Sequence, residues 1–443
     1  MDNQKETAVY NAKELGMAKT FVFGLQHMFA MFGATVLVPA ITGLSVSSTL
    51  LFAGAGTLLF HAITKMKIPA FLGSSFAFLA AYLTIAPNGE KELLPYACFG
   101  VALAGLFYIV LAGFFKAFGA KKVMRFFPPV VTGPIIISIG LCLAGWALSC
   151  CQVNWGIALV AVATIIGCNI FGKGMVKIVP ILIGIIVSYT VAAVAGFVDF
   201  TNVETAPWIG MPFRMSDTVF SLIGNADTSL LLTAAVAAIP ISLATMMEHI
   251  GDVAAIGSTV GRNFIADPGL HRTLTGDGLA TSVASMFGAP ANTTYSENTG
   301  VLALTKVYDP LVVRVAACLA ILMSFCPKFA ALISAMPTAT LGGVSLILYG
   351  MISAIGVRNV VESKVDFTRS RNVIIAGLIL VLAVGIKYGL PGEAIIVPLG
   401  SFSIGMSGLA TAALTGIIMN AVLPGNEYEF DDGLNDSATL GRY

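Results

Sequence analysis

The stretch GAPANTTYSENTGVLALTK, residues 288–306, places a carboxylate, Glu297, inside a strongly apolar chain. Pro290 and Gly300 interrupt the stretch, and residues 293–295 favour an extended backbone, so the pattern does not predict a spanning helix. Irregular polar backbone at membrane depth is tolerated only where it is buried in protein or lines a cavity. The stretch is therefore predicted to form part of a binding site.

The composition around this stretch is that of a polytopic membrane protein. Of the 443 residues, 57% are hydrophobic and 11% are charged, whereas soluble domains carry about 25% charged residues. No charged residue occurs between Arg125 and Lys173, which leaves room for two spans of ~20 residues each. The net charge of +1 argues against a nucleic-acid partner.

Breaks at charge, proline and glycine divide the chain into seven apolar segments and then seven more. They lie near residues 20–42, 46–64, 68–87, 93–115, 129–150, 154–172, 175–198, 229–257, 274–289, 293–306, 310–334, 338–356, 372–390 and 394–423. We therefore expect an all-α polytopic fold of fourteen transmembrane segments. Residues 201–228 between the two sets are interpreted as an interfacial connector.

The positions of lysine and arginine predict the orientation, because basic loops stay in the cytoplasm. With the N-terminus inside, the clusters at 65–67, 116–125, 173–177, 262–272 and 358–371 all fall on the cytoplasmic side. The polar C-terminal tail returns to the cytoplasm after an even number of spans. We expect a multi-pass protein of the inner (plasma) membrane with both termini in the cytoplasm.

Two sequence echoes relate the halves. Gln26-His27 and Glu248-His249 match at an offset of 222, and GSSFAF at 73–78 matches TTYSEN at 293–298 at an offset of 220. Because seven is odd, tandem halves of seven spans insert with opposite orientation, as in the inverted repeats of secondary transporters. The interrupted third and tenth segments occupy corresponding places, which predicts that they hold the substrate.

Four ionisable side chains in the apolar segments are candidates for chemistry. Glu248 is interpreted as lining a cavity with Glu297, or else as pairing with His249 to lock helices together. His27 is equally interpretable as a proton carrier or as a hydrogen-bond partner between helices. Asp252, one turn beyond Glu248, is either a proton site or a helix-terminus partner of Arg262 or Arg272.

Two carboxylates beside free backbone N–H groups suit a small planar molecule with ring N–H donors and carbonyl acceptors. Phe76, Phe78 and Tyr295 are candidates to pack against such a ring, although Phe78 is also typical of a core residue.

Other chemistries find no support. The sequence has no G-x-x-x-x-G-K-[ST] pattern for nucleotide binding, no nucleophile elbow and no HExxH pattern. The seven cysteines have no metal-type spacing to histidines, and His61 is interpreted as a surface or loop residue. We expect no metal, no cofactor and no enzymatic activity.

Several motifs together resemble those of the bacterial uracil permeases of the nucleobase–ascorbate transporter (nucleobase–cation symporter-2) family. The similarity runs from about residue 20 to 425. It is carried by QHMFAMFGATVLVP (26–39), KIPAFLGSSFAF (67–78), EHIG (248–251), DPGLHR (267–272), NTTYSENTGVLALTKVY (292–308), GGVSLILYG (342–350) and ESKVDF (362–367). The family signature is met by Glu297, Asn298, Gly300, Thr305 and Lys306.

The resemblance implies two inverted repeats, with short antiparallel strands in segments 3 and 10. A core domain would comprise 20–120 and 229–335, a gate domain 121–228 and 336–425, with cytoplasmic ends at 1–19 and 426–443.

The resemblance also assigns roles to residues. Glu248 and Glu297 would bind the pyrimidine ring, backbone N–H groups at Phe76 and Ser296 would meet its carbonyl oxygens, and Tyr295 would pack beside it. The other implied residues are Tyr349 at the substrate site and His27, Asp252 and Asn298 for support or proton coupling. Asp252 and Ser296 depart from the family pattern, since a histidine and a glycine are usual there.

The resulting prediction is a proton-coupled uracil importer that works by alternating access and forms a homodimer through its gate domains. Glu at 297 favours uracil, since relatives that carry xanthine or urate usually have Gln there. The alternatives are a xanthine or purine permease of the same family, and an anion transporter or channel with the same 7+7 fold. A membrane receptor or enzyme that binds without transporting is a third.

Overall fold

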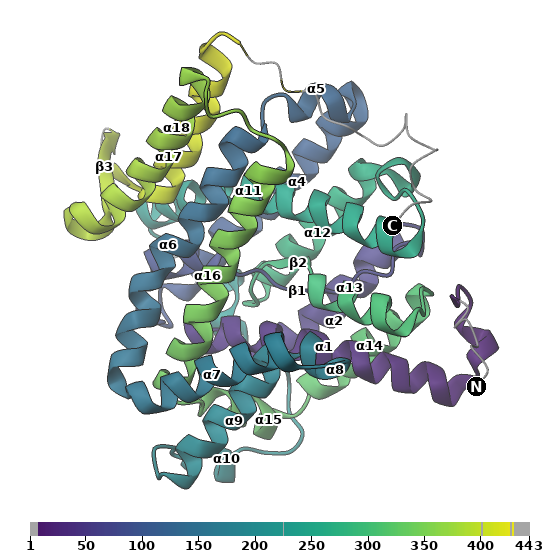
Figure 1. Ribbon diagram of the computed structural model, residues 1–443. Coiled ribbons are helices and arrows are strands. Elements are labelled where there is room, and N and C mark those ends of the chain that lie inside the picture. Colours follow the sequence, from purple (N-terminus) through teal and green to yellow (C-terminus); the bar gives the residue numbers. More distant parts are fainter. Residues whose placement is uncertain (1–7, 225, 400–401, 426–427, 429–443) are drawn as a thin grey trace.

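The computed structural model describes residues 8–224, 226–399, 402–425 and 428, and these are mostly helical (Figure 1). The elements of the first half are η1 (Ala12–Leu15), α1 (Met17–Thr42), α2 (Val46–Ile63), β1 (Leu72–Ser74), α3 (Leu79–Ile85), α4 (Leu94–Phe118), α5 (Ala120–Met124), α6 (Pro129–Val153), α7 (Trp155–Phe171), α8 (Met175–Ile178), α9 (Pro180–Val194), α10 (Thr201–Thr205), η2 (Met215–Asp217) and η3 (Val219–Leu222). The elements of the second half are α11 (Thr228–Val260), η4 (Ile265–Gly269), α12 (Leu270–Met286), β2 (Asn292–Thr294), α13 (Ser296–Thr305), α14 (Pro310–Ser324), α15 (Pro327–Ser334), α16 (Thr338–Glu362), α17 (Ser370–Gly389), η5 (Pro391–Glu393), β3 (Ala394–Leu399), β4 (Phe402–Ser407) and α18 (Gly408–Val422).

Many of these helices have the length and composition of membrane spans. Among the described residues, seven helices are long and apolar enough to cross a membrane, and an eighth span results if α14 and α15, which meet at a bend of 88°, count as one. The remaining apolar helices, such as α7, α9 and α18, are shorter than 18 residues. The fold is therefore a predominantly helical membrane type.

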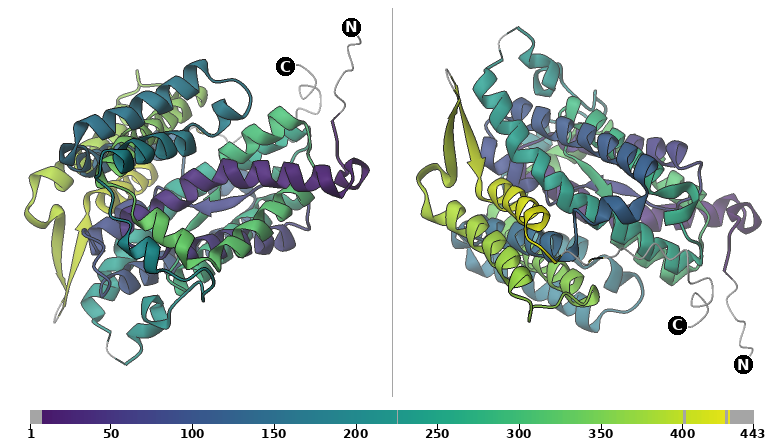
Figure 2. Two further views of the ribbon diagram at one scale, coloured as in Figure 1. Left: turned by 90° about the horizontal axis from the view of Figure 1, so that it is seen from below. Right: turned by 90° about the horizontal axis from the view of Figure 1, so that it is seen from above.

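The helices pack in two groups (Figures 1 and 2). One group comprises α1 to α4 and α11 to α15, in which α4 packs on α11 and α12, and α2 packs on α12 and α14. The other comprises α6, α7, α9, α16, α17 and α18, with its most extensive contact between α6 and α16. The contacts between groups are fewer and run mainly from α11 to β4 and α18 and from α1 to α9.

Two short strands cross the middle of the first group. β1 pairs with β2 in antiparallel register, with Gly73 opposite Thr293. These two residues are also the ones that the repeat offset of 220 relates. β1 and β2 are therefore equivalent elements of the two sequence halves, and they pair with each other.

The last expected segment, 394–423, is not a single helix. Its first part forms the antiparallel hairpin β3–β4, and only Gly408–Val422 is helical. The reason lies in its composition: the β-branched run Ile395–Val397 favours strand, and Pro398 disfavours the interior of a helix. The expected all-α fold thus has a second strand pair that the sequence analysis missed.

The interpretation of His61 as a surface or loop residue was also wrong. His61 lies in α2 and is fully buried, and its Nε2 is 2.8 Å from the carbonyl oxygen of Ala70. A hydrogen bond to backbone makes the burial of this polar ring acceptable.

Candidate functional site

The site is built around the paired strands, whose outer edges need hydrogen-bond partners because their backbone is buried away from water: Leu72 is 0% and Asn292 5% exposed. Two threonines, one on each neighbouring helix, supply them. The hydroxyl of Thr57 on α2 accepts from Leu72 N at 2.9 Å and lies 3.2 Å from Leu72 O. The hydroxyl of Thr281 on α12 does the same for Asn292, at 3.2 Å from N and 2.9 Å from O.

Tyr295 fixes the spacing between the strands and the neighbouring helix. Its hydroxyl donates to Ser74 O at 2.9 Å, and the residue is only 4% exposed. A Cβ added at Gly73 would lie 2.4 Å from this ring. Gly73 is therefore needed for the close approach of an aromatic ring to the backbone.

Each strand leads into a helix, β1 into α3 after four residues and β2 into α13 after one. α13 begins at Ser296, and no side chain caps its first turn. The first N–H groups of a helix have no partner within the helix, and this end carries the positive side of the helix dipole. The first turn of α13, which contains Glu297, therefore offers backbone donors at the site.

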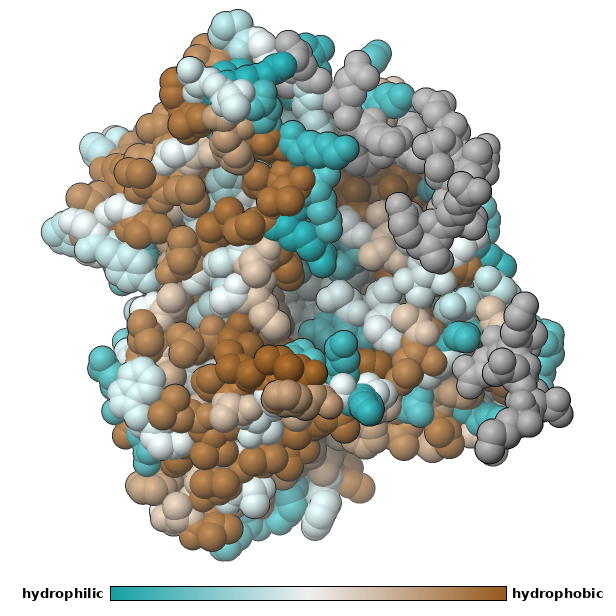
Figure 3. Space-filling view, viewed as in Figure 1, coloured by the Kyte–Doolittle hydropathy of each residue, from teal (hydrophilic) through white to brown (hydrophobic). Residues whose placement is uncertain are grey.

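A cavity of about 390 Å³ lies between this first turn and α16. Figure 3 shows the surface hollowed near the middle of the face where these elements meet. Its lining includes both carboxylates, Glu248 from α11 and Glu297 from α13, together with Phe76 and Ser296. In the described part of the chain, neither carboxylate has an ion-pair partner.

A second cavity of about 370 Å³ adjoins the first and shares Ser296, Glu297 and Met351 with it. Asn169 and Lys177 lie on its far side. Glu297 thus lines both cavities, at the place where they adjoin.

His27 and Asn298 form a contact between α1 and α13. The Asn298 amide nitrogen donates to His27 O at 3.0 Å and lies 3.1 Å from His27 Nδ1, and both side chains are buried. Of the two interpretations of His27, the structure shows the hydrogen bond between helices. The pair holds α13 in place one residue after Glu297.

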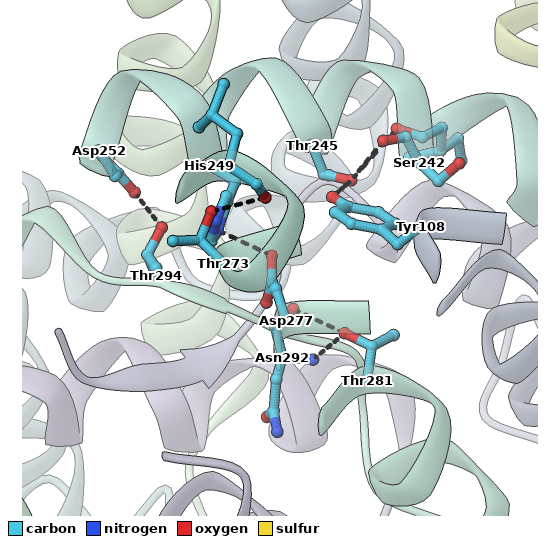
Figure 4. A network of polar contacts seen from close by, with 12 residues as sticks. Tyr108, Ser242, Thr245, His249, Asp252, Thr273, Asp277, Thr281, Asn292 and Thr294 are labelled. Atoms are coloured by element: carbon cyan, nitrogen blue, oxygen red, sulfur yellow. Dashed lines mark hydrogen bonds and ion pairs between the residues drawn. The ribbon is translucent and has the colours of Figure 1, made fainter. Parts of the chain in front are cut away.

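Among the residues that the structure describes, Asp252 forms no ion pair with Arg262 or Arg272. Its Oδ2 accepts a hydrogen bond from the hydroxyl of Thr294 at 2.7 Å (Figure 4). This bond joins the helix that carries Glu248 to the strand that precedes Glu297. Asp252 therefore links the elements that hold the two carboxylates.

A buried pair behind the site was missed by the sequence analysis. His249 does not pair with Glu248; its Nδ1 lies 3.1 Å from Asp277 Oδ2, and the two side chains are 0% and 1% exposed (Figure 4). The available signal was that Asp277 is the only charged residue in the expected segment 274–289. The pair ties α11 to α12.

Two of the aromatic candidates do not reach the cavity. Tyr349 and Phe78 are each 1% exposed and are absent from its lining. The reason for Tyr349 is helical geometry: Leu348, Met351 and Ile355 face the cavity, and a step of one residue turns the side chain by 100°. Tyr349 instead lies where α16 packs on α6, with its carbonyl close to Gly140.

Comparison with known proteins adds independent information. A family model described as the permease family matches residues 18–392. The uracil permease of Bacillus caldolyticus is 42% identical over 412 residues, which cover 90% of this chain and 91% of that protein. The uracil permease of Escherichia coli strain K12 is 36% identical over 420 residues, 92% of this chain and 91% of that protein.

Solved structures share the fold at low sequence identity. The transmembrane domain of a cyanobacterial bicarbonate transporter, BicA, matches with a TM-score of 0.61 and 14% identity, over 94% of this chain and 99% of that chain. The structure of SLC26A9 matches with a TM-score of 0.64 and 10% identity, over 93% of this chain and 66% of that chain. From the family model and the relatives, the chain belongs to the permease family, as a relative of the bacterial uracil permeases among the nucleobase–ascorbate transporters.

Proposed function

We propose that this protein is a secondary transporter that carries uracil across the inner membrane, in symport with protons and by alternating access. The observation that carries the proposal is the cavity of about 390 Å³ that brings Glu248 and Glu297 together beside the first turn of α13. Its volume lies within the usual range for small-molecule sites. The names of the relatives agree with this substrate.

In the proposed binding mode the two carboxylates accept hydrogen bonds from the ring N–H groups of uracil. Backbone N–H groups at Phe76 and Ser296 donate to its carbonyl oxygens. Uracil offers two N–H donors and two carbonyl acceptors on one planar ring, so this arrangement satisfies both kinds of group. Phe76 packs against the ring, while Tyr295 supports the strands from behind.

The proton is carried by the acidic group formed by Glu248, Asp252 and Glu297. Acidic side chains inside membrane segments are rare and usually belong to substrate or proton pathways. Thr294 holds Asp252 at 2.7 Å, which couples this carboxyl to the strand beside the substrate. His27 and Asn298 support the site by their mutual hydrogen bonds. No cofactor takes part.

The division into two groups of helices supports alternating access. We propose that 20–120 and 229–335 form a core domain that moves against a gate domain, 121–228 and 336–425. The separate packing of the two groups supports this division.

The proposed number of spans is fourteen, in two inverted repeats. This number results when the shorter helices and the strand–helix units β1–α3 and β2–α13 are each counted as a span. The tail at 426–443 lies almost entirely outside the described residues.

The cavities support an inward-facing arrangement with both termini in the cytoplasm. The two cavities at Glu297 reach Arg358 and Lys177, which belong to basic clusters assigned to the cytoplasm. A separate cavity of about 500 Å³ is lined by Lys91 and Arg214, which belong to none of the basic clusters assigned to the cytoplasm. We further propose a homodimer through the gate domain, whose helix α7 exposes apolar side chains such as Leu159 and Ile170.

Uptake of radiolabelled uracil into proteoliposomes tests the proposal. We expect accumulation that depends on an imposed inward proton gradient and is lost when the gradient is collapsed. Asp252→Asn is expected to abolish gradient dependence while retaining uracil binding. Uptake that ignores the gradient in the unmodified protein would contradict proton coupling, and absence of uracil binding would contradict the substrate.

A xanthine or purine permease is the main alternative, and stronger competition by xanthine than by uracil would establish it. An anion transporter is a weaker candidate. The bicarbonate transporter shares the fold but is only 14% identical, so it indicates nothing about the substrate. Two carboxylates in the cavity also disfavour an anion.

A further inference from the structure

A stripe of bulky apolar side chains runs along the end of α4. Phe107, Leu111, Phe114 and Phe118 line one pocket, and their spacing of four, three and four residues places them on one helical face. Phe114 and Phe118 stack with ring centroids 6.0 Å apart. Both rings are about half exposed, at 47% and 57%, so the stripe faces outward.

A sharp turn brings a short basic helix over the end of this stripe. Gly119 ends α4 with φ +80, a backbone conformation that side chains other than glycine rarely adopt. The chain then forms α5, in which Val123 and Met124 are buried while Lys121 and Lys122 are exposed. This is the pattern of a short helix that lies at a membrane interface.

The end of α4, α5 and the residues that follow α5 line an open pocket of about 490 Å³. Besides the α4 stripe, its lining consists of Lys122, Val123, Phe126 and Phe127. The pocket is therefore lined by seven apolar side chains and a single cation, Lys122. A water-soluble metabolite would find no polar partner there except that cation.

The charged residues near the pocket in the sequence are all positive. Lys116, Lys121 and Lys122 are exposed beside it, and residues 93–198 contain no aspartate or glutamate. Basic clusters at the cytoplasmic ends of membrane helices attract anionic lipid headgroups. The pocket thus presents an apolar slot and a cationic rim, which match the two parts of a phospholipid.

We propose that this pocket binds one anionic phospholipid of the inner leaflet. An acyl chain lies along the aromatic stripe of α4, and the phosphate of the headgroup contacts Lys121 and Lys122. The site is distinct from the cavity at Glu297, because the two share no lining residue. α5 also connects α4 to α6, so the lipid sits at a junction between the two groups of helices.

Native mass spectrometry of the full chain with dioleoyl phosphatidylglycerol or dioleoyl phosphatidylcholine tests the proposal. We expect the anionic lipid to be retained preferentially. Lys121→Gln with Lys122→Gln is expected to weaken its binding at least about tenfold, because each basic residue adds to the attraction. Phe118→Ala is expected to weaken it through lost acyl contact.

Two matched variants serve as controls. Lys13→Gln with Lys19→Gln removes two exposed lysines elsewhere, and Phe21→Ala removes a phenylalanine that is 50% exposed on α1; neither should change retention. Equal retention of the two lipids, or unchanged binding in the Lys121 and Lys122 variant, would overturn the proposal.

The acidic C-terminal tail is the rival occupant of the basic rim. Tyr428 packs against the cluster that contains Val123 and Met124, and Asp431 and Asp432 follow it in the sequence. If Asp431→Asn with Asp432→Asn gains binding of the anionic lipid that the unmodified chain lacks, the tail is the occupant and the lipid proposal is wrong. Equal preferential binding in both chains supports the lipid.

Discussion

At the scale of single residues, Glu297 and its neighbours show how closely the site depends on individual side chains. Glu297 lines both adjoining cavities, and the next residue, Asn298, is tied to His27. Asp252 holds the preceding strand through Thr294. The backbone on either side of Glu297, the proposed uracil-binding carboxylate, is thus held by hydrogen bonds that do not involve Glu297 itself.

Glu297→Gln is expected to weaken uracil binding by about 10-fold or more, because a hydrogen bond to a charged group contributes about 1.5–3 kcal/mol. The fold should be preserved, since the two side chains have nearly the same shape. Isothermal titration with uracil measures the change. Glu204→Gln, at an exposed position on α10, is the control, and an equal loss in both variants would contradict the role of Glu297.

At the scale of elements, the strand pair depends on two threonines that the sequence analysis did not single out. Thr57 and Thr281 each bond both the N–H and the C=O of one strand residue. They stand at corresponding places in the two halves, on α2 and α12. Strand edges that would otherwise be unsatisfied are closed by side chains of neighbouring helices.

Thr57→Val and Thr281→Val are each expected to destabilise the protein by about 1–3 kcal/mol, because a buried N–H and C=O lose their partner while the side-chain shape is kept. Thermal unfolding in detergent measures the loss. Thr57→Ser retains the hydroxyl and should lose much less. A valine variant as stable as its serine counterpart would show that the strand edge is satisfied in another way.

The N-terminal segment connects the ends of the two helices that carry the carboxylates. Val9 N donates to Lys306 O at 2.9 Å, just after α13, and the Tyr10 hydroxyl donates to Val260 O at 2.9 Å, at the end of α11. Tyr10 also packs on Tyr308 and beneath the Arg262 guanidinium. The segment therefore holds α11 and α13 in register with one another.

Tyr10→Ala is expected to raise the KM for uracil by up to about fivefold, because about 1 kcal/mol of hydrogen bond and ring contact no longer orders the two helices. Transport assays over a range of uracil concentrations measure it. Lys13→Ala, an exposed position in the same segment, should leave the KM unchanged, and an equal effect of the two variants would contradict the role of Tyr10.

At the scale of the whole molecule, cavities open in different places on the two groups of helices. The cavities at Glu297 reach α16 and α8. The cavity of about 500 Å³ instead lies between the end of α1, the start of α2, the connector residues 211–217 and helix α15. An inward-facing arrangement follows if the basic clusters mark the cytoplasm.

Cysteine labelling on a background without the native cysteines tests this arrangement. Ile355 lines the cavity at Glu297. A cysteine placed there by Ile355→Cys should react with a membrane-impermeant maleimide from the cytoplasmic side only. Ala331→Cys, in the other cavity, should react only from outside, because each cavity opens to one compartment. Labelling with the opposite sidedness would show that the orientation is reversed.

Much of this protein was determined by the sequence alone. Its scarcity of charge required a membrane-type fold, and the echo between residues 73–78 and 293–298 related β1 to β2. Carboxylates at 248 and 297 were predictable as site residues because a charge inside an apolar segment needs a local reason. These are properties of the chain read residue by residue.

Only the tertiary structure decided which polar side chains meet. His249 pairs with Asp277 rather than Glu248, Asp252 bonds Thr294, and Tyr349 turns away from the cavity. Each outcome depends on the rotation and separation of packed helices, and a rotation of 100° per residue decides whether a side chain faces a cavity or a neighbouring helix. That rotation is set by packing between distant segments, which no local pattern in the sequence records.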